Sequence, residues 1–276
     1  MKLDLPAGAC NAHCHVFGPR GRFPYAADAP FIPEHDATSA ELYALNDRLG
    51  LQRCVVVQST CHGFDNSVTE DAIAGRPRDY RGIALVRPDV SGHELVRLDA
   101  AGIRGIRFNF AKHLGSSTPI DDILALATRF APLGWHLQIH GAPSLLTDLG
   151  PAFLRSPVPV VIDHIGRIDA GLGLDQADFK ALQGLMRDSR FWVKVSGMER
   201  ISREAAPWRD AHPYARALVE EFPDRVLWGN DWPHPNLKAG PPDDDLLVDL
   251  IEVMAPQPAE RRRLLVDNPH RLYRFG

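Results

Sequence analysis

GIRGIRFN (102–109), STPIDDILALATRFAPLG (117–134) and GWHLQIH (134–140) follow one another closely in the sequence. The first and the last are short apolar runs with β-branched residues, which is typical of buried strands. The middle segment has apolar residues three and four positions apart and ends at Gly134, which is typical of a helix closed by glycine. We therefore predict a strand, a helix and a second strand over these residues.

The same alternation recurs along the whole chain. Helical periodicity also appears in ATSAELYALNDRLG (37–50) and DQADFKALQGLMRDS (175–189), where Thr, Ser or Asp near the start is suited to cap a helix. The further strand candidates are GACNAHCH (8–15), RCVVVQS (53–59), RGIALVR (81–87), VPVVIDH (158–164), FWVKVSG (191–197) and RVLWGND (225–231).

Eight strand-and-helix units in 276 residues predict an α/β fold, and specifically a TIM barrel. A doubly wound sheet is the alternative. We expect one domain over residues 1–276, because a chain of this length can form one large core. The Pro- and Gly-rich segment 16–37 is expected to fold over the site, and the tail 258–276 is expected to form a closing helix that stops at Asn268-Pro269.

Composition excludes several classes of protein. Hydrophobic residues make up 45% and charged residues 24%, with a formal net charge of −4, so a nucleic-acid partner is not indicated. No run reaches the roughly 18 apolar residues of a membrane span, and the N-terminus lacks the apolar core of a signal peptide. We expect a cytoplasmic protein without a membrane partner, either a monomer or a small homo-oligomer.

The cysteines do not predict a disulfide framework or a zinc knuckle. Cys10, Cys14, Cys54 and Cys61 show no CxxC spacing. We expect reduced and mostly buried thiols.

Polar residues occur near the predicted strand ends, where a barrel of this type carries its active site. Side chains alternate along a strand, so His13 and His15 should point one way and Cys14 the other. The same two-residue spacing recurs on the fourth and fifth strands. If these faces are the barrel interior, imidazoles, an arginine and carboxylates converge. The residues concerned are His13, His15, Arg107, Asn109, Gln138, His140, Asp163, His164 and Asp231.

Such a set permits two kinds of chemistry. Imidazoles and a carboxylate can hold a divalent metal that lowers the pKa of bound water to roughly 7. They can also work without metal, with the carboxylate as general base and the imidazoles polarising a carbonyl oxygen. The residues alone leave both open. The candidate metal ligands, if a metal is present, are His13, His15, His140, His164 and Asp231.

These residues and their surroundings resemble the amidohydrolase superfamily, and within it the 2-pyrone-4,6-dicarboxylate hydrolases, lactonases of aromatic compound degradation. The likeness runs over nearly the whole chain. The segments that carry it are AHCHVFGP (12–19), CHGFDN (61–66), GIRGIRFNF (102–110), PVPVVIDHIGR (157–167), WGNDWPHPN (228–236) and NPHRLY (268–273).

The resemblance implies that water opens a small carboxylated cyclic ester. Asp231 would be the general base that activates the water. His13, His15 and His164 would lie around the lactone carbonyl and stabilise the oxyanion.

Further residues would bind the substrate. Arg107 and Arg200 match arginines that hold carboxylates, a role suited to the planar guanidinium. Thr60 and Asn236 would lie at the edge of the pocket. Arg167 and His234 are assigned equally well to the pocket or to loop packing.

Three positions depart from the family pattern. Phe31 stands where the pyrone hydrolases have a tyrosine, and Lys112 and His113 replace their Lys-Arg pair. The third departure is His140, which replaces a tyrosine on the fifth strand. His113 and His140 are expected to contact the substrate. His140 also restores a histidine used by metal-dependent members, so we expect either no cofactor or one zinc or manganese ion.

Two other readings stay open at this point. The same barrel could serve a metal-dependent decarboxylase or hydratase of an aromatic-derived acid. It could also be a non-enzymatic ligand-binding protein, which would require the convergent polar residues to be accidental.

Overall fold

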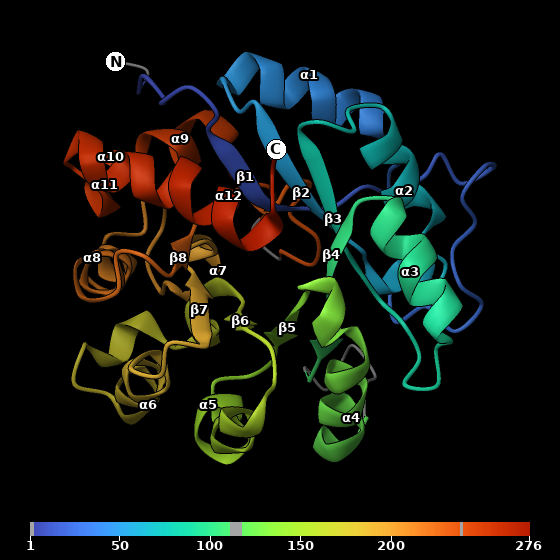
Figure 1. Ribbon diagram of the computed structural model, residues 1–276. Coiled ribbons are helices and arrows are strands. Elements are labelled where there is room, and N and C mark those ends of the chain that lie inside the picture. Colours follow the sequence, from blue (N-terminus) through green and yellow to red (C-terminus); the bar gives the residue numbers. More distant parts are fainter. Residues whose placement is uncertain (1–2, 111–117, 238–239) are drawn as a thin grey trace.

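The computed structural model describes residues 3–110, 118–237 and 240–276. These residues form one parallel sheet of eight strands in the order β1-β2-β3-β4-β5-β6-β7-β8, surrounded by helices (Figure 1). The TIM-barrel prediction is confirmed, and the doubly wound alternative is wrong because neighbouring strands follow chain order throughout. The strands are β1 Cys10–Cys14, β2 Arg53–Val57, β3 Tyr80–Ala84, β4 Ile103–Asn109, β5 His136–His140, β6 Val160–Ile162, β7 Phe191–Lys194 and β8 Val226–Leu227.

Hydrogen bonds between β1 and the chain around β8 close the barrel. The Ala12 N–H donates to the Trp228 carbonyl and the Asp231 N–H donates to the His13 carbonyl, each at 2.8 Å. Gly229 makes this approach possible, because a Cβ there would lie 2.4 Å from the His13 nitrogen. The short strand β8 therefore reaches β1 only because residue 229 has no side chain.

The helices begin and end where local chemistry favours it. In α1, Thr38 accepts from the Glu41 N–H in a capping box, and Gly50 ends the helix with φ 82°. Helix α4 buries one stripe, including Ile123 and Phe130, against the sheet. The helices are α1 Ser39–Leu49, α2 Ser67–Ala74, α3 Gly92–Ala100, α4 Ile120–Phe130, α5 Ser144–Asp148, α6 Ala177–Met186, α7 Met198–Ile201, α8 His212–Glu221, α9 Asp244–Asp249, α10 Ile251–Met254, α11 Pro258–Arg262 and α12 Asn268–Tyr273.

The barrel interior changes character along its axis. At the amino ends of the strands it is mostly apolar: Tyr273 and Phe275 from the C-terminal segment pack there with Cys10 and Val55, and buried His136 lies against the Tyr273 ring. Above this layer the buried side chains are polar. They include His13, Arg107, Gln138, Asp163 and Lys194.

The C-terminal segment differs from the prediction. Helical backbone does not stop at Asn268-Pro269 but continues from α11 through a π-helical turn, Arg263–Asp267, into α12. Pro269 lies in the first turn of α12, directly after the π-helical turn, and the wider turn is the local irregularity at which the chain accommodates a residue without an N–H.

Segment 16–37 connects β1 to α1, and an antiparallel bridge between Phe17 and Ala37 brings its ends together. The four cysteines are free and buried, as predicted. Among the described residues, no helix has both the length and the apolar character needed to cross a bilayer.

Candidate active site

A cavity of about 340 Å³ opens where the carboxyl ends of the strands meet. This volume is in the range of small-molecule sites. Its lining contains most of the residues that the sequence singled out, together with Arg167. The lining residues are His15, Phe31, Ser59, Thr60, Arg107, His140, His164, Arg167, Arg200, Asp231, Pro235 and Asn236.

Strand β1 brings two imidazoles together. His13 Nε2 lies 3.3 Å from His15 Nε2, while the Cys14 side chain turns away and lies against Cys54. The β1–β2 register shifts between Asn11 and Cys14, an irregularity of the kind that re-aims side chains next to active sites. His13 is fully buried and lies outside the cavity lining, so only His15 of the pair faces the cavity.

Asp231 lies at the centre of the cluster. Its Oδ1 is 3.2 Å from His15 Nε2 and 3.5 Å from His13 Nε2. Its Oδ2 accepts from Arg200 Nε at 2.5 Å and lies 3.7 Å from His164 Nε2. Burial would raise the pKa of Asp231, but Arg200 and His164 outweigh burial and hold that pKa well below its usual value. Asp231 is therefore ionised at neutral pH.

Several lining residues have left-handed backbone conformations. The φ angles are 51° at His164, 57° at Arg167, 64° at Asp231 and 61° at Asn236. For residues other than glycine such conformations cost about 1–3 kcal/mol each and are concentrated at functional sites. The loops after β6 and β8 thus hold these side chains in positions that relaxed backbone would not favour.

Three guanidinium groups face the cavity. Arg107 donates from Nε to Asp163 Oδ2 at 2.9 Å and is 6% exposed. Arg200 lies in α7, donates to Asp231, and also donates to the Pro235 carbonyl, so protein acceptors hold its guanidinium in the cavity wall. Burial, followed by repulsion from Arg200, lowers the pKa of Arg167. This wall is suited to bind a carboxylate.

A charged layer lies directly beneath the cavity. Lys194 Nζ is 2.9 Å from Gln138 Oε1, 3.0 Å from His13 Nδ1 and 3.4 Å from Asp163 Oδ1. Burial raises the pKa of Asp163, but Lys194 and Arg107 outweigh this and hold it well below its usual value. We did not assign a role to Lys194 or Asp163 from the sequence.

A profile of the amidohydrolase family matches residues 10–275. The chain belongs to the amidohydrolase family. This amidohydrolase is 49% identical to a 2-pyrone-4,6-dicarboxylate hydrolase of Comamonas testosteroni, over 99% of this chain and 92% of that protein. It is 39% identical to a 4-sulfomuconolactone hydrolase of Rhizobium radiobacter, over 99% of this chain and 92% of that one.

A solved structure agrees with this family assignment. The amidohydrolase superposes with a TM-score of 0.86 and 28% identity on a structure from Acinetobacter baumannii, named as a probable 2-pyrone-4,6-dicarboxylic acid hydrolase with citric acid bound. The match covers 97% of this chain and 100% of that one. The predicted resemblance is thereby confirmed.

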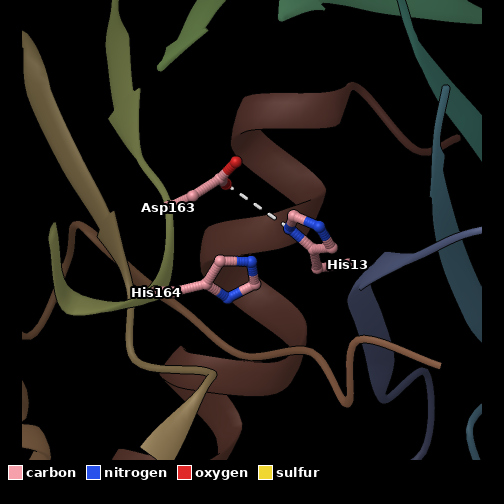
Figure 2. A group of neighbouring side chains, drawn as sticks. All are labelled: His13, Asp163 and His164. Carbon is pink, nitrogen blue, oxygen red and sulfur yellow. Dashed lines mark ion pairs between the residues drawn. The ribbon is translucent and has the colours of Figure 1, made fainter. Parts of the chain in front are cut away.

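Two groups of side chains have metal-ligand spacing in this amidohydrolase. One is His13, Asp163 and His164 (Figure 2), and the other is His13, His15 and Asp231; within each group the ligand atoms lie within 4.8 Å of one another. His140 lines the cavity but belongs to neither group among the described residues.

Protein cations already lie against both groups. Lys194 Nζ is 3.0 Å from His13 Nδ1, and Arg200 Nε is 2.5 Å from Asp231 Oδ2. A divalent ion at either group would have to sit beside these positive charges, and an ion at His13 Nδ1 would have to displace Lys194. The donor set therefore fits a divalent metal poorly.

The remaining predicted residues are placed as follows. Thr60 and Asn236 lie in the cavity lining. His140 is buried, with Nδ1 3.3 Å from Asn109 Oδ1; burial and then Arg107 hold its pKa well below the usual value, so its ring is neutral. His234 pairs with Asp244 at 3.2 Å and packs in the loop. His113 lies outside the described residues.

Proposed function

We propose that this amidohydrolase hydrolyses a small, carboxylated cyclic ester, 2-pyrone-4,6-dicarboxylate or a related lactone. The observation that carries the proposal is the ionised, buried carboxylate of Asp231 facing a cavity whose wall holds three guanidinium groups. The relatives named for lactone hydrolysis, one at 49% identity over nearly the full chain, support it.

Asp231 is the general base in this reaction. It accepts a proton from water as the water oxygen bonds to the lactone carbonyl carbon. The tetrahedral intermediate then collapses by breaking the bond to the ring oxygen, which takes the proton from Asp231. The products are a new carboxylate, formed with loss of a second proton to solvent, and a hydroxyl or enol group.

The oxyanion needs a hydrogen-bond donor at the cavity wall. His15 Nδ1 lies 2.7 Å from the Val57 carbonyl and must donate to it, so this ring nitrogen is not available to the oxyanion. His164 Nδ1 lies 3.1 Å from Ser196 Oγ. We assign the Ser196 hydroxyl as donor to His164, which leaves the His164 Nε2–H for the oxyanion.

The arginines hold the anionic end of the substrate. Arg200 uses its Nε–H on Asp231 and one N–H of each terminal nitrogen on Pro235, so two of its five N–H groups remain for a ligand. Arg107 and Arg167 add further donors. With three guanidinium groups in its lining, the cavity suits a substrate with one or two anionic groups.

No metal is needed in this proposal. The positive charge that a metal would supply near the histidines comes from Lys194 and Arg200.

The test is a panel of lactones with purified protein. We expect hydrolysis of at least one carboxylated member among 2-pyrone-4,6-dicarboxylate, muconolactone and sugar-acid lactones. Hydrolysis is measured as the loss of ring absorbance or as the release of acid. Asp231→Asn should lower kcat by about 10²–10⁴ with an unchanged circular dichroism spectrum. Inactivity on the whole panel, or full activity of Asp231→Asn, would refute the proposal. Carbon dioxide release from an aromatic acid would instead support the decarboxylase alternative.

A further inference from the structure

Lys194 is a buried cation in the barrel interior that neither contacts the substrate nor transfers a proton in the reaction described above. It is 0% exposed and projects from the end of β7 beneath His13. A lysine in this position is costly unless its N–H groups are satisfied. Its contacts therefore show what it does there.

Three acceptors surround the Lys194 nitrogen, one for each N–H of an ammonium group. They are Gln138 Oε1 at 2.9 Å, His13 Nδ1 at 3.0 Å and Asp163 Oδ1 at 3.4 Å. The Gln138 amide cannot be reversed, because its Nε2 donates to Asp163 Oδ2 at 3.0 Å. The oxygen of Gln138 therefore faces Lys194, and Lys194 donates to Gln138 and to His13, while its contact with Asp163 Oδ1 is an ion pair.

His13 Nδ1 has two neighbours, Lys194 Nζ at 3.0 Å and Asp163 Oδ1 at 3.4 Å. The longer contact, drawn in Figure 2, is an ion-pair distance and not a hydrogen bond, since Asp163 Oδ1 accepts none among the described residues. The ammonium group of Lys194 has no lone pair, so His13 Nδ1 must accept from it and the ring N–H of His13 is at Nε2.

One atom that faces His13 Nε2 needs such a donor. Asp231 Oδ1, at 3.5 Å, accepts no hydrogen bond among the described residues. His15 Nε2 lies 3.3 Å from His13 Nε2 on the same side. The opposite tautomer of His13 would turn a lone pair toward the Asp231 carboxylate, an arrangement that favours a bound cation.

We propose that Lys194 is a positioning residue: it fixes His13 as the Nε2–H tautomer, which orients Asp231 and His15, and it thereby takes the place of a metal ion at the two β1 histidines. The inference rests on the proposed function only in giving Asp231 a catalytic task. Proton position and metal affinity are measurable without turnover.

The first experiment is ¹⁵N NMR of the wild-type protein with labelled histidine rings, with the His13 signals assigned from His13→Gln. We expect a protonated Nε2 and an unprotonated Nδ1 at His13. A protonated Nδ1 in the wild type would overturn the proposal. This result does not depend on any variant folding, and failure of the lactone panel would leave it unchanged.

The second experiment uses Lys194→Met, a variant of similar length that leaves Asp163 paired with Arg107 at 2.9 Å. We expect the His13 proton to move to Nδ1, toward Asp163, and the Zn²⁺ affinity measured by calorimetry to rise at least about tenfold. On an active substrate, kcat should fall about 10- to 100-fold with little change in KM. An unchanged tautomer, or an unchanged Zn²⁺ affinity with a changed tautomer, would contradict the inference.

The matched control is Arg81→Met. Arg81 is another buried cation of the barrel, 8% exposed, but its hydrogen bonds go to backbone carbonyls at the opposite end, including that of Tyr80. This variant should lose stability while the His13 tautomer and the Zn²⁺ affinity stay as in the wild type. If Arg81→Met changed them as Lys194→Met does, a general loss of packing would explain the data and the proposal would fall.

Discussion

Replacing Arg200 by Met removes the cation that directly contacts the proposed base. In the wild type, Arg200 Nε lies 2.5 Å from Asp231 Oδ2, and both terminal nitrogens lie 3.1 Å from the Pro235 carbonyl. Methionine keeps most of the side-chain length and packing but none of the donors. The substitution therefore tests what the charge of Arg200 does to Asp231.

The expected effect on the pKa of Asp231 follows from its surroundings. An adjacent arginine lowers the pKa of a carboxyl group by about 1–3 units, and burial raises it. In the wild type the balance holds the pKa of Asp231 well below its usual value. Without Arg200 the pKa should rise by about 1–3 units, and only the neighbouring histidines His164, His15 and His13 would oppose burial.

The sign of the pH dependence follows from the role of a base. A general base works only when unprotonated, so kcat/KM falls as the pH drops through its pKa in the free enzyme. For the wild type this fall should lie below about pH 4, because the pKa of Asp231 is below the ordinary aspartate value. For Arg200→Met it should move upward by about 1–3 pH units.

KM should change as well, because Arg200 also faces the cavity. Losing a hydrogen bond to a charged group costs about 1.5–3 kcal/mol, or about 10- to 150-fold in KM. The assay is kcat and KM on an active lactone from about pH 3 to 9, a range in which Arg200→Met should show its acid limb at a higher pH than the wild type. The control is Arg203→Met, which removes an arginine that is 60% exposed and pairs with Asp169. An acid limb at the same pH in Arg200→Met and in the wild type would refute the assigned role of Asp231 or its coupling to Arg200.

Other perturbations have equally definite outcomes. Asp163→Asn leaves the buried cations Lys194 and Arg107 without this counter-charge and should lower the free energy of unfolding, measured in urea, by about 3–5 kcal/mol. A loss under about 1 kcal/mol would contradict the assigned charge pairing beneath the cavity. Because the pKa of Asp163 is held well below its usual value, the wild type should lose stability as the pH falls below about 4, whereas Asp163→Asn should lose less over that range. Dialysis against a chelator should leave kcat unchanged, and inactivation reversed by Zn²⁺ would show that a metal is required. Gly229→Ala should lower both stability and activity, since its Cβ would lie 2.4 Å from the His13 nitrogen, while Gly184→Ala, in an open position of α6, should stabilise by about 0.5–1 kcal/mol.

The sequence predicted the order and type of the strands because the alternation of apolar runs and helical segments repeats eight times. It predicted their ends less well. The run 225–231 appears as one strand in the sequence, but β8 comprises only Val226–Leu227. The chain beyond it is a loop in which Asp231 has a φ of 64°. Hydrophobic periodicity carries no information about such a conformation, because hydrogen bonds to β1 impose it.

The candidate site was likewise predicted only in part. Alternation along β1 correctly put His13 and His15 on one side, because that rule is local to a strand. Lys194 could not be found in this way, since a lysine in FWVKVSG looks the same whether it faces water or the barrel interior. The signal available in the sequence was the alternation of side chains along β7, which decides which residues face the barrel interior. Arg200 was assigned to substrate on resemblance alone, and its contact with Asp231 depends on the packing of α7, which the sequence does not reveal.

The balance of charge in and below the cavity suggests which ligand completes the site. Four cationic groups are brought together there among the described residues, and the ionised carboxylates that face them are Asp163 and Asp231. Glu199 is nearby, but burial raises its pKa, so it is a weaker counter-charge. Buried charge of one sign is unfavourable until it is neutralised. A ligand with one or two negative charges would neutralise the excess, and it would do so at the wall formed by Arg107, Arg167 and Arg200 rather than at the histidines. The anionic groups would thus bind on one side and the ester carbonyl would lie over Asp231, which is the orientation that hydrolysis requires. In the proposed reaction the same cations would determine both substrate choice and metal exclusion. The charges that make a divalent ion unfavourable at the histidines also favour an anionic lactone beside them.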